Sequence, residues 1–372
     1  MERIEIEPRP DWKAKVEQLG FGFHTAESLY WNEAAYYRFT RREVDELETA
    51  TQELHQICLE AVQQVIDRRL LGRLGIPEAF TPLIVDSWER EDLSLYGRFD
   101  LFYDGKHQPK LYEYNADTPT ALFEASAVQW YWLEERFAQD DQFNSIHEKL
   151  IERWRESGVN GPIHFACVRD HAEDFATTLY IEDTAIQAGL KTSRLYVDEI
   201  GWNGKQFVDL ENLPISTLFK LYPWEWMIRE EFAAYLLKEP WRLVEPAWKM
   251  ILSNKGILPL LWELFPEHPN LLPAYDSAEP LGETYVKKPR LGREGANITV
   301  CVNGCQVTTE GEYGHEGFVY QAFLPPPELD GHHPVIGSWI VRDEPAGIGI
   351  RESEVPVTDN MSSFVPHLIR EE

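Results

Sequence analysis

Two short segments around residue 100 carry charged side chains at alternate positions. Residues 98–103 read R-F-D-L-F-Y and residues 110–115 read K-L-Y-E-Y-N, with the polar turn D-G-K-H-Q-P between them. Side chains alternate between the two faces of a strand. We therefore expect a β-hairpin in which Arg98 and Asp100 share a face of the first strand, while Glu113 and Asn115 share a face of the second.

The register of this hairpin decides which charges meet. A hairpin that pairs symmetrically about residues 106 and 107 brings the polar faces of its two strands together. A slip of two residues would preserve that arrangement, whereas a slip of one residue would break it. The cross-strand pairs expected in the symmetric register are Asp100 with Glu113, Arg98 with Asn115, and Phe102 with Leu111.

A pair of facing carboxylates suggests a cation. At ~5 Å, Asp100 and Glu113 would repel each other by roughly 3 kcal/mol at an effective dielectric near 20. Carboxylate and amide oxygens are the ligands that magnesium takes together with waters and phosphates, and an arginine beside them suits a forked contact to phosphate. The alternative interpretation is a solvated hairpin with one surface ion pair.

A second candidate region is a basic loop that contains glycines. Residues 284–298 read T-Y-V-K-K-P-R-L-G-R-E-G-A-N-I, so a predicted strand ends in two lysines and a loop follows with Gly292 and Gly295. Such a loop can direct backbone N–H groups and cations at phosphates. The P-loop pattern GxxxxGK[ST] is absent, and a plain basic turn between two strands is the alternative.

Three further places could contribute to a nucleotide site. Lys255 lies in the turn S-N-K-G-I-L-P, residues 317–324 form the apolar strand G-F-V-Y-Q-A-F-L, and Arg351 follows P-A-G-I-G-I. The strand could offer adenine a backbone donor and acceptor, and the small residues before Arg351 would allow a ligand to approach closely. The alternatives are a solvated lysine, a core strand and a surface arginine on a hairpin.

The surrounding pattern predicts the elements that position these residues. Thr40 and Glu43 form a capping box, and apolar residues at helical spacing then predict a helix over residues 41–70. Residues 163–170 and 193–200 read as strands with a helix over 172–188 between them, which predicts a β-α-β unit and a parallel sheet. A tight turn follows at residues 202–205.

The rest of the chain reads as helices and then short strands. We expect helix over residues 119–157 and again from Pro240 to Phe265. Short strands are predicted within E-T-Y-V-K-K-P, A-N-I-T-V-C-V, G-F-V-Y-Q-A-F-L and P-V-I-G-S-W-I-V-R-D. With no flexible linker in view, residues 1–372 are predicted to form one unit of mixed α/β (α+β) class.

Composition narrows the classes of partner. Hydrophobic residues make up 43% of the 372 residues, which is enough for a sizeable core. The net charge of −28 disfavours binding to nucleic acid or to anionic membranes. The four cysteines contain no CxxC pair, so neither a zinc site nor a disulfide framework is expected, and the N-terminal residues lack a signal-like apolar run. These features predict a cytoplasmic protein.

Taken in order, these segments resemble the glutathionylspermidine synthase family, and specifically its synthetase domain. The resemblance covers essentially the whole chain and is closest to the stand-alone acid–amine ligases of that family. It implies a circularly permuted ATP-grasp fold, with a β-α-β substrate lobe over about 160–215 and a nucleotide lobe over about 240–330. The segments that carry it are YGRFDLFYDGKHQPKLYEYNADTPT, FKLYPWEW, LSNKGILPLLW, YVKKPRLGREGANI and GSWIVRDEPAGIGIRES.

The resemblance also implies an activity. ATP would phosphorylate a substrate carboxylate, and an amine would attack the acyl phosphate to form an amide, so the implied enzyme is an ATP- and magnesium-dependent acid–amine ligase with ATPase activity. Its partners would be a small carboxylate and a peptide- or polyamine-like amine, with no protein partner expected. The alternatives are a genuine glutathionylspermidine synthetase and a nucleotide-responsive binding protein with idle ATPase activity.

The family pattern also implies roles for individual residues. Asp100 and Glu113 would hold one magnesium ion, and Glu113 and Asn115 a second. Arg98 and Arg351 would be catalytic, with Arg98 on phosphate in the transition state. The residues implied in ATP binding are Arg98, Phe99, Asp100, Lys255, Lys288, Glu294, Gly295, Gln321, Ala322, Phe323 and Leu324.

The substrate side departs from the family pattern. Serines that contact glutathione in the family appear here as Thr118 and Thr120. The paired glutamates for the polyamine appear as Glu173 and Asp174. The hydroxyl and acid chemistry is retained while the geometry changes, so we expect a ligase that does not make glutathionylspermidine.

Overall fold

The long helix α2 begins where its capping box predicts. In the computed structural model, which describes residues 1–25, 28–238, 241–293, 295–356 and 362–370, α2 spans Arg41–Asp67. The Thr40 hydroxyl accepts a hydrogen bond from the Glu43 N–H (3.3 Å), and the Glu43 carboxylate accepts one from the Thr40 N–H (2.9 Å). The helix ends three residues before the predicted boundary because Arg69 adopts a left-handed φ of 57°.

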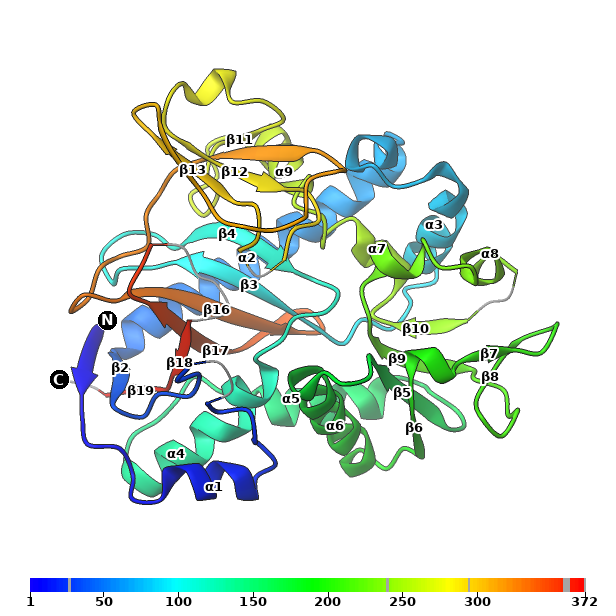
Figure 1. Ribbon diagram of the computed structural model, residues 1–372, viewed down its shortest axis with the longest axis horizontal. Coiled ribbons are helices and arrows are strands. Elements are labelled where there is room, and N and C mark those ends of the chain that lie inside the picture. Colours follow the sequence, from blue (N-terminus) through cyan, green and yellow to red (C-terminus); the bar gives the residue numbers. More distant parts are fainter. Residues whose placement is uncertain (26–27, 239–240, 294, 357–361, 371–372) are drawn as a thin grey trace.

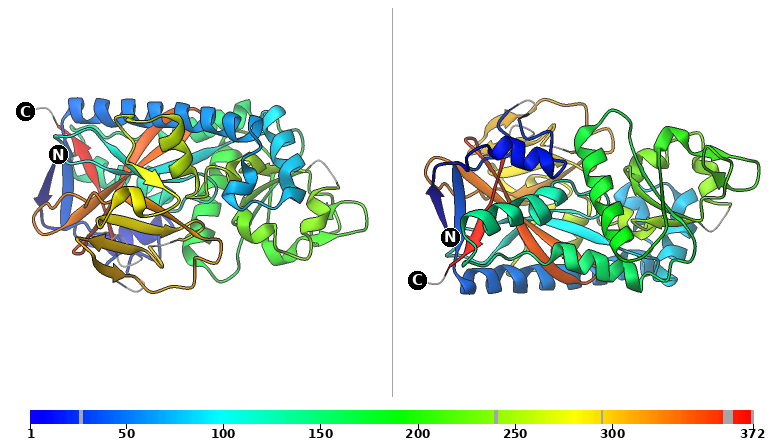
Figure 2. Two further views of the ribbon diagram at one scale, coloured as in Figure 1. Left: turned by 90° about the horizontal axis from the view of Figure 1, so that it is seen from above. Right: turned by 90° about the horizontal axis from the view of Figure 1, so that it is seen from below.

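One face of α2 covers the central sheet of the molecule. Its apolar residues are buried against β16 and β17, and the helix also contacts α9 (Ile257–Leu264). Figure 2 shows α2 as a long helix along one edge of the molecule in both views. The buried apolar side chains of this face are Val44, Leu47, Ala50, Leu54, Cys58, Ala61, Val62 and Val65.

The central sheet is antiparallel and joins two distant parts of the chain. Its strand order is β18-β17-β16-β3-β4, so the predicted hairpin pairs with strands from the C-terminal region. The strand bounds are β3 Tyr96–Phe102, β4 Lys110–Asn115, β16 His333–Val341, β17 Glu344–Ser353 and β18 Ser363–Val365.

The hairpin register is confirmed at its polar end and wrong at the other end. Arg98 pairs with Asn115 and Asp100 with Glu113, as expected, but a β-bulge then places Leu101 opposite Leu111. The predicted pairing of Phe102 with Leu111 is therefore wrong. The bulge moves Leu111 from the polar face to the apolar face, where it is fully buried like Leu101.

A second antiparallel sheet lies above the central sheet in Figure 1. Its order is β11-β15-β12-β13-β14, and α9 packs against β11 and β15. It contains three of the four strands predicted in the C-terminal part of the chain, while the fourth, β16, belongs to the central sheet. Its strands are β11 Ala274–Tyr275, β12 Tyr285–Pro289, β13 Thr299–Val302, β14 Cys305–Thr308 and β15 Phe318–Ala322.

The predicted β-α-β unit forms part of a parallel sheet. β5 pairs in parallel with β6 and β9, and β9 with β10, giving the order β10-β9-β5-β6. This sheet lies at the right of Figure 1. Helix α6 (Ala172–Gln187) crosses over between β5 and β6, one residue shorter than predicted. The strands are β5 Ile163–Cys167, β6 Thr192–Tyr196, β9 Thr217–Leu221 and β10 Arg242–Val244.

Two helical predictions were too long. Residues 242–244 form β10 rather than helix, because Leu243 and Val244 are buried against β9 and complete the parallel sheet. Within residues 119–157 the structure has two helices, α4 (Gln129–Arg136) and α5 (Ile146–Glu156), with a π-helical turn, η3 (Glu124–Val128), before the first.

A small sheet brings the two ends of the chain together. β2 (Ala35–Phe39) lies between β1 (Glu2–Glu5), antiparallel to it, and β19 (His367–Ile369), parallel to it. Both termini lie at this side of the molecule in Figure 1. Among the described residues, no helix has the length and apolar character needed to cross a membrane.

The remaining elements are short. They connect the sheets or form small outer hairpins, and Gly204 provides the left-handed φ (94°) at the predicted turn after Trp202. The helices are α1 Trp12–Gln18, α3 Thr81–Glu89, α7 Trp224–Met227 and α8 Ala233–Leu236. The 3₁₀ turns are η1 Leu71–Leu74, η2 Glu78–Phe80, η4 Val197–Glu199, η5 Ala247–Met250 and η6 Glu279–Leu281. The outer hairpin strands are β7 Gly201–Trp202 and β8 Phe207–Val208.

Candidate active site

The polar face of the β3–β4 hairpin and the β12–β15 sheet line one cavity. Most of the residues singled out in the sequence lie on its walls, although they come from segments more than 200 residues apart. They are Arg98, Asp100, Glu113, Asn115, Thr118, Thr120, Lys255, Lys288, Gly295, Gln321, Ala322, Phe323, Leu324 and Arg351.

Three predicted residues are placed differently, and for a fourth the structure gives no placement. The Phe99 side chain is buried on the opposite face of β3 and stacks on Tyr114 (3.9 Å between ring centroids), so only its backbone could reach a nucleotide. Glu173 and Asp174 lie in the first turn of α6, outside this cavity lining. Glu294 lies outside the described residues.

Arg98 lines the cavity from strand β3 of the hairpin. Its guanidinium makes a forked contact to Asp100, with Nε–Oδ1 at 2.6 Å and Nη2–Oδ2 at 3.0 Å, and Nη1 donates to the Thr120 carbonyl at 2.6 Å. The strand beside it has Gly337, where a Cβ would lie only 2.9 Å from the Arg98 side chain. The chain thus makes room for Arg98 by having no side chain at residue 337.

Glu113 is the carboxylate that faces the lysines. Its Oε2 lies 3.1 Å from the Lys255 ammonium, which also donates to the Gly292 carbonyl at 2.6 Å. Burial by itself would raise the pKa of Glu113, but the charges of Lys255 and Lys288 outweigh it and lower the pKa to about 2. The carboxylate is therefore ionised at neutral pH.

Lys288 is buried at the centre of the cavity wall. Its ammonium donates to the Tyr112 carbonyl (2.9 Å) and to Gln321 Oε1 (2.7 Å). Burial lowers the pKa of Lys288 to about 8, although the negative charge of Glu113 acts in the opposite direction. At neutral pH a positive charge thus lies between the hairpin and the sheet above it.

The hairpin carboxylates already have cationic partners from the chain. Arg351 Nη2 donates to Asp100 Oδ2 at 3.1 Å, and the Asn115 amide donates to Asp100 and to Glu113 at 3.3 Å each. This arrangement neutralises the repulsion predicted for the facing carboxylates. It uses side chains from β3, β4 and β17 and a lysine from the turn before α9.

The donor set fits magnesium. Asp100, Glu113 and Asn115 bring two carboxylates and one amide group to a common face, and carboxylate and amide oxygens are hard ligands of the kind that Mg²⁺ takes in combination with phosphate. Within the described ranges, no group of three or more His, Cys, Asp or Glu side chains could hold a metal ion, so the candidate site depends on two carboxylates and the Asn115 amide. An ion on these ligands would take over the charge neutralisation that Arg351 and Lys255 provide here.

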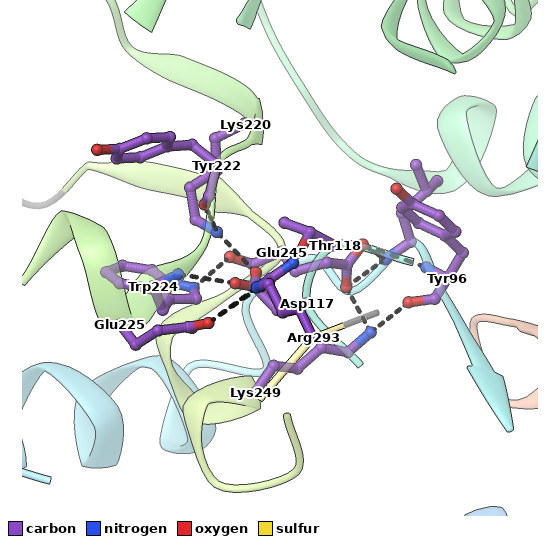
Figure 3. A network of polar contacts seen from close by, with 11 residues as sticks. Tyr96, Asp117, Thr118, Lys220, Tyr222, Trp224, Glu225, Glu245, Lys249 and Arg293 are labelled. Atoms are coloured by element: carbon purple, nitrogen blue, oxygen red, sulfur yellow. Dashed lines mark hydrogen bonds and ion pairs between the residues drawn. The ribbon is translucent and has the colours of Figure 1, made fainter. Parts of the chain in front are cut away.

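Arg293 is a cavity residue that the sequence did not single out. Its guanidinium donates to the Thr118 hydroxyl at 3.0 Å and to Glu225 at 3.0 Å, as Figure 3 shows. The contact joins the glycine-containing loop to the segment after β4 and to α7. Only the motif R-E-G in the loop could have drawn attention to this arginine, and its partners are 68 and 175 residues away.

Near this contact are two buried ion pairs. Lys220 on β9 donates to Asp117 at 2.6 Å, and the Trp224 N–H donates to the second Asp117 oxygen at 2.8 Å. Lys249 pairs with Glu245 at 2.5 Å. Figure 3 shows both pairs around Thr118, with Lys220 above it and Lys249 below. The parallel sheet is thereby attached to the loop that continues from the hairpin.

The fold is related to the ATP-grasp fold. A solved structure, the apo form of a glutathione synthetase-like effector from Globodera pallida, matches with a TM-score of 0.57 at 11% identity, covering 92% of this chain and 90% of that one. A family model described as glutathionylspermidine synthase preATP-grasp matches residues 3–370. The chain belongs to the glutathionylspermidine synthase family.

Curated relatives agree with this assignment. A Haemophilus influenzae protein provisionally named acid–amine ligase is 42% identical over 99% of both chains. Trypanothione synthetase from Crithidia fasciculata is 32% identical over 84% of this chain, and the bifunctional glutathionylspermidine synthetase/amidase of Escherichia coli is 30% identical over 90%. The chain spans 53% and 59% of the lengths of these two. The protein is an ATP-dependent ligase of the class that forms C–N bonds.

Proposed function

We propose that this protein joins a small carboxylate to an amine through an acyl phosphate, with ATP as the phosphoryl donor. The observation that supports this most directly is the cavity itself. Asp100, Glu113 and Asn115 form one wall, and Lys255 and Lys288 face them from the nucleotide side. Phosphoryl transfer depends mainly on such charge neutralisation and alignment.

In this proposal the chain's own residues place ATP across the cavity. Lys255 and Lys288 contact phosphates, the loop with Gly295 and Glu294 covers them, and the segment from Gln321 to Leu324 contacts adenine. Gln321 already accepts a hydrogen bond from Lys288, which couples the adenine strand to the phosphate lysine.

The metal ligands and arginines act on the same phosphate. Two magnesium ions would supply charge neutralisation, one held by Asp100 and Glu113 and the other by Glu113 and Asn115. Arg98 and Arg351 both contact Asp100, so they lie beside the predicted metal position. There they would stabilise the negative charge on the transferred phosphoryl group.

The substrates occupy the far side of the cavity. Thr118 and Thr120 are proposed to contact the acid, and Glu173 and Asp174 the amine. Burial raises the pKa of Glu173, and a hydrogen bond from Thr120 opposes that rise, which links the two groups. The lobes at about 160–215 and 240–330, the permuted strand order and a cytoplasmic location remain part of the proposal. The four free cysteines support that location.

The test begins with nucleotide binding and product formation. We expect magnesium-dependent ATP binding by calorimetry, and release of ADP and phosphate that increases when an acid and an amine are both present. A panel of small acids, peptides and amines is the screen. Absence of MgATP binding would refute the proposal. A rate of ATP hydrolysis that does not change with any acid or amine in the panel would instead support a nucleotide-responsive binding protein.

A matched pair of variants tests the site assignment. Asp100→Ala is expected to abolish magnesium-dependent ATP hydrolysis, whereas Asp45→Ala, which removes an exposed carboxylate from α2, is expected to leave it unchanged. Unchanged hydrolysis by Asp100→Ala would show that the metal site is elsewhere.

Glutathionylspermidine synthesis itself is a separate candidate, because two relatives carry synthetase names for that chemistry or a related one. Incubation with glutathione, spermidine and MgATP, followed by mass spectrometry, distinguishes it. We expect no conjugate, since Thr118 here is bound to Arg293 and threonines replace the serines of the family pattern.

A further inference from the structure

A buried ion pair connects the first strand of the chain to the strand that carries Arg351. Arg3 on β1 makes a forked contact to Glu352 on β17, with Nε–Oε2 and Nη2–Oε1 both at 2.8 Å. The Tyr37 hydroxyl on β2 donates to the same carboxylate at 2.7 Å. The side chains of Arg3 and Glu352 are only 4% and 1% exposed. Three donors therefore hold the Glu352 carboxylate in one orientation away from solvent.

Arg351 and Glu352 are neighbours in β17, so their side chains point to opposite faces of the central sheet. Arg351 lines the cavity, where its Nη2 donates to Asp100 at 3.1 Å. Glu352 points to the small terminal sheet, in which Arg3 and Tyr37 are cross-strand partners. These two residues and Glu352 lie outside the cavity lining. The ion pair and the cavity arginine thus share one stretch of backbone.

The end of β17 is where support from neighbouring strands is shortest. β17 ends at Ser353, and its outer neighbour β18 pairs with it over residues 350–352 only. Figure 1 shows this end of the central sheet beside the small terminal sheet, and β18 contacts β2 there. The Arg351 guanidinium lies several bonds from the backbone, so a small rotation of β17 would displace it. The contacts of Glu352 oppose such a rotation from the other face.

The choice of a charged residue at position 352 needs a reason beyond packing. Ile348 and Ile350, on the same face of β17, are fully buried apolar residues. A buried ion pair often stabilises a fold no more than apolar side chains of similar size would. What the forked contact adds is a defined direction, because both oxygens of Glu352 must meet the guanidinium of Arg3 in its plane.

We propose that Arg3 is a positioning residue for Arg351. Through Glu352 it sets the orientation of β17, and thereby the place of the Arg351 guanidinium beside the phosphoryl group during transfer. This inference rests on the proposed function, in which Arg351 stabilises charge on the transferred group. A displaced Arg351 should therefore lower kcat and leave ground-state binding of MgATP nearly unchanged.

Steady-state ATP hydrolysis and calorimetry on the full chain separate these two effects. We expect Arg3→Met, assayed well below its unfolding temperature, to lower kcat by about 5- to 20-fold while the Kd for MgATP stays within about twofold of wild type. Arg3→Lys keeps the charge without the fork and should recover part of the loss. In an Arg351→Ala background, which should itself lower kcat, Arg3→Met should change kcat less than about twofold, because the residue through which it acts is absent.

Arg9→Met is the matched control. Arg9 makes a similar buried forked contact to Glu33, with Nε–Oε2 at 3.0 Å and Nη2–Oε1 at 2.6 Å, but neither chain neighbour of Glu33 lines the cavity. This variant should lower the unfolding temperature about as much as Arg3→Met and leave kcat unchanged. Equal losses of kcat in the two variants would show a general loosening of the fold and overturn the positioning role.

Two other results would also overturn the inference. One is wild-type kcat in Arg3→Met, and the other is an undiminished effect of Arg3→Met in the Arg351→Ala background. If Arg3→Met does not fold, Tyr37→Phe decides: it removes one hydrogen bond to Glu352 and should lower kcat about two- to threefold, and wild-type kcat would refute the inference.

Failure of the proposed function has a different signature. A wild-type protein that neither binds nor hydrolyses MgATP would refute that function and this inference with it. Wild-type kcat in Arg351→Ala would show that Arg351 takes no part in phosphoryl transfer. A lower kcat in Arg351→Ala together with wild-type kcat in Arg3→Met would overturn the positioning role alone.

Discussion

The contact between Glu113 and the two lysines makes a quantitative prediction for the ligand-free protein. Glu113→Gln keeps the shape of the side chain and removes its charge, so Lys255 and Lys288 lose their main counter-charge. The lysines lower the pKa of Glu113 from 4.5 to about 2. At about 1.4 kcal/mol for each pH unit, this lowering corresponds to ~3 kcal/mol of stability at pH 7.

The sign of the pH dependence follows from the direction of the shift. Because the folded protein lowers the pKa of Glu113, the stabilisation is fully present above pH 4.5 and is lost as the pH falls toward about 2. The part of the difference in unfolding free energy between wild type and Glu113→Gln that comes from ionisation of Glu113 should be constant from pH 8 to 5. It should narrow by about 1 kcal/mol at pH 3.5.

Urea unfolding followed by tryptophan fluorescence measures this difference. Glu60→Gln, at an exposed position of α2, is the control and should match wild type within ~0.5 kcal/mol. Equal stability of Glu113→Gln and wild type at pH 7 would refute the electrostatic account. A difference that does not change between pH 5 and pH 3.5 would show that lost hydrogen bonds, rather than charge, cause it.

Three further substitutions test other contacts. Lys288→Met should weaken MgATP binding by about 10- to 100-fold in calorimetry, because it removes a charged donor from the phosphate side; an unchanged Kd would contradict this. Gly337→Ala places a methyl group 2.9 Å from the Arg98 side chain, so we expect a several-fold lower kcat for ATP hydrolysis and ~1–3 kcal/mol lower stability. An unchanged kcat would show that Arg98 adjusts freely. Lys220→Met leaves Asp117 buried without its lysine partner and should cost about 3–5 kcal/mol in urea unfolding; a loss below ~1 kcal/mol would contradict this expectation.

Alternation along the two strands was enough to predict the polar face of the hairpin. It placed Arg98, Asp100, Glu113 and Asn115 together, and both polar pairs formed as expected. The same rule failed at Leu111 because a bulge shifts the alternation by one residue. The residue type at position 111 could have indicated the bulge, since without it an apolar leucine two residues from Glu113 would lie on the polar face.

Long-range contacts limited what could be predicted around the site. Glu124 meets Tyr30 across 94 residues, and Lys220 meets Asp117 across 103. Nothing in the local pattern of either segment indicates its partner, because buried polar pairs are decided by packing between elements. The helix prediction for residues 242–244 was wrong for a related reason. A segment of three residues is too short to show a strand pattern, and it forms a strand because it pairs with the edge of β9.

The mixed origin of the central sheet has a consequence for the order of folding during synthesis. β3 and β4 leave the ribosome early, yet their neighbour β16 follows more than 200 residues later. Until β16 has been synthesised, the edge of β3 has no strand to pair with, and Arg98 lacks the space beside Gly337 that β16 provides. Domains usually fold as they emerge, and pairings distant in sequence form slowly. Nascent chains that stop before β16 should therefore lack nucleotide affinity and be prone to aggregation, so translation itself delays the appearance of the active site.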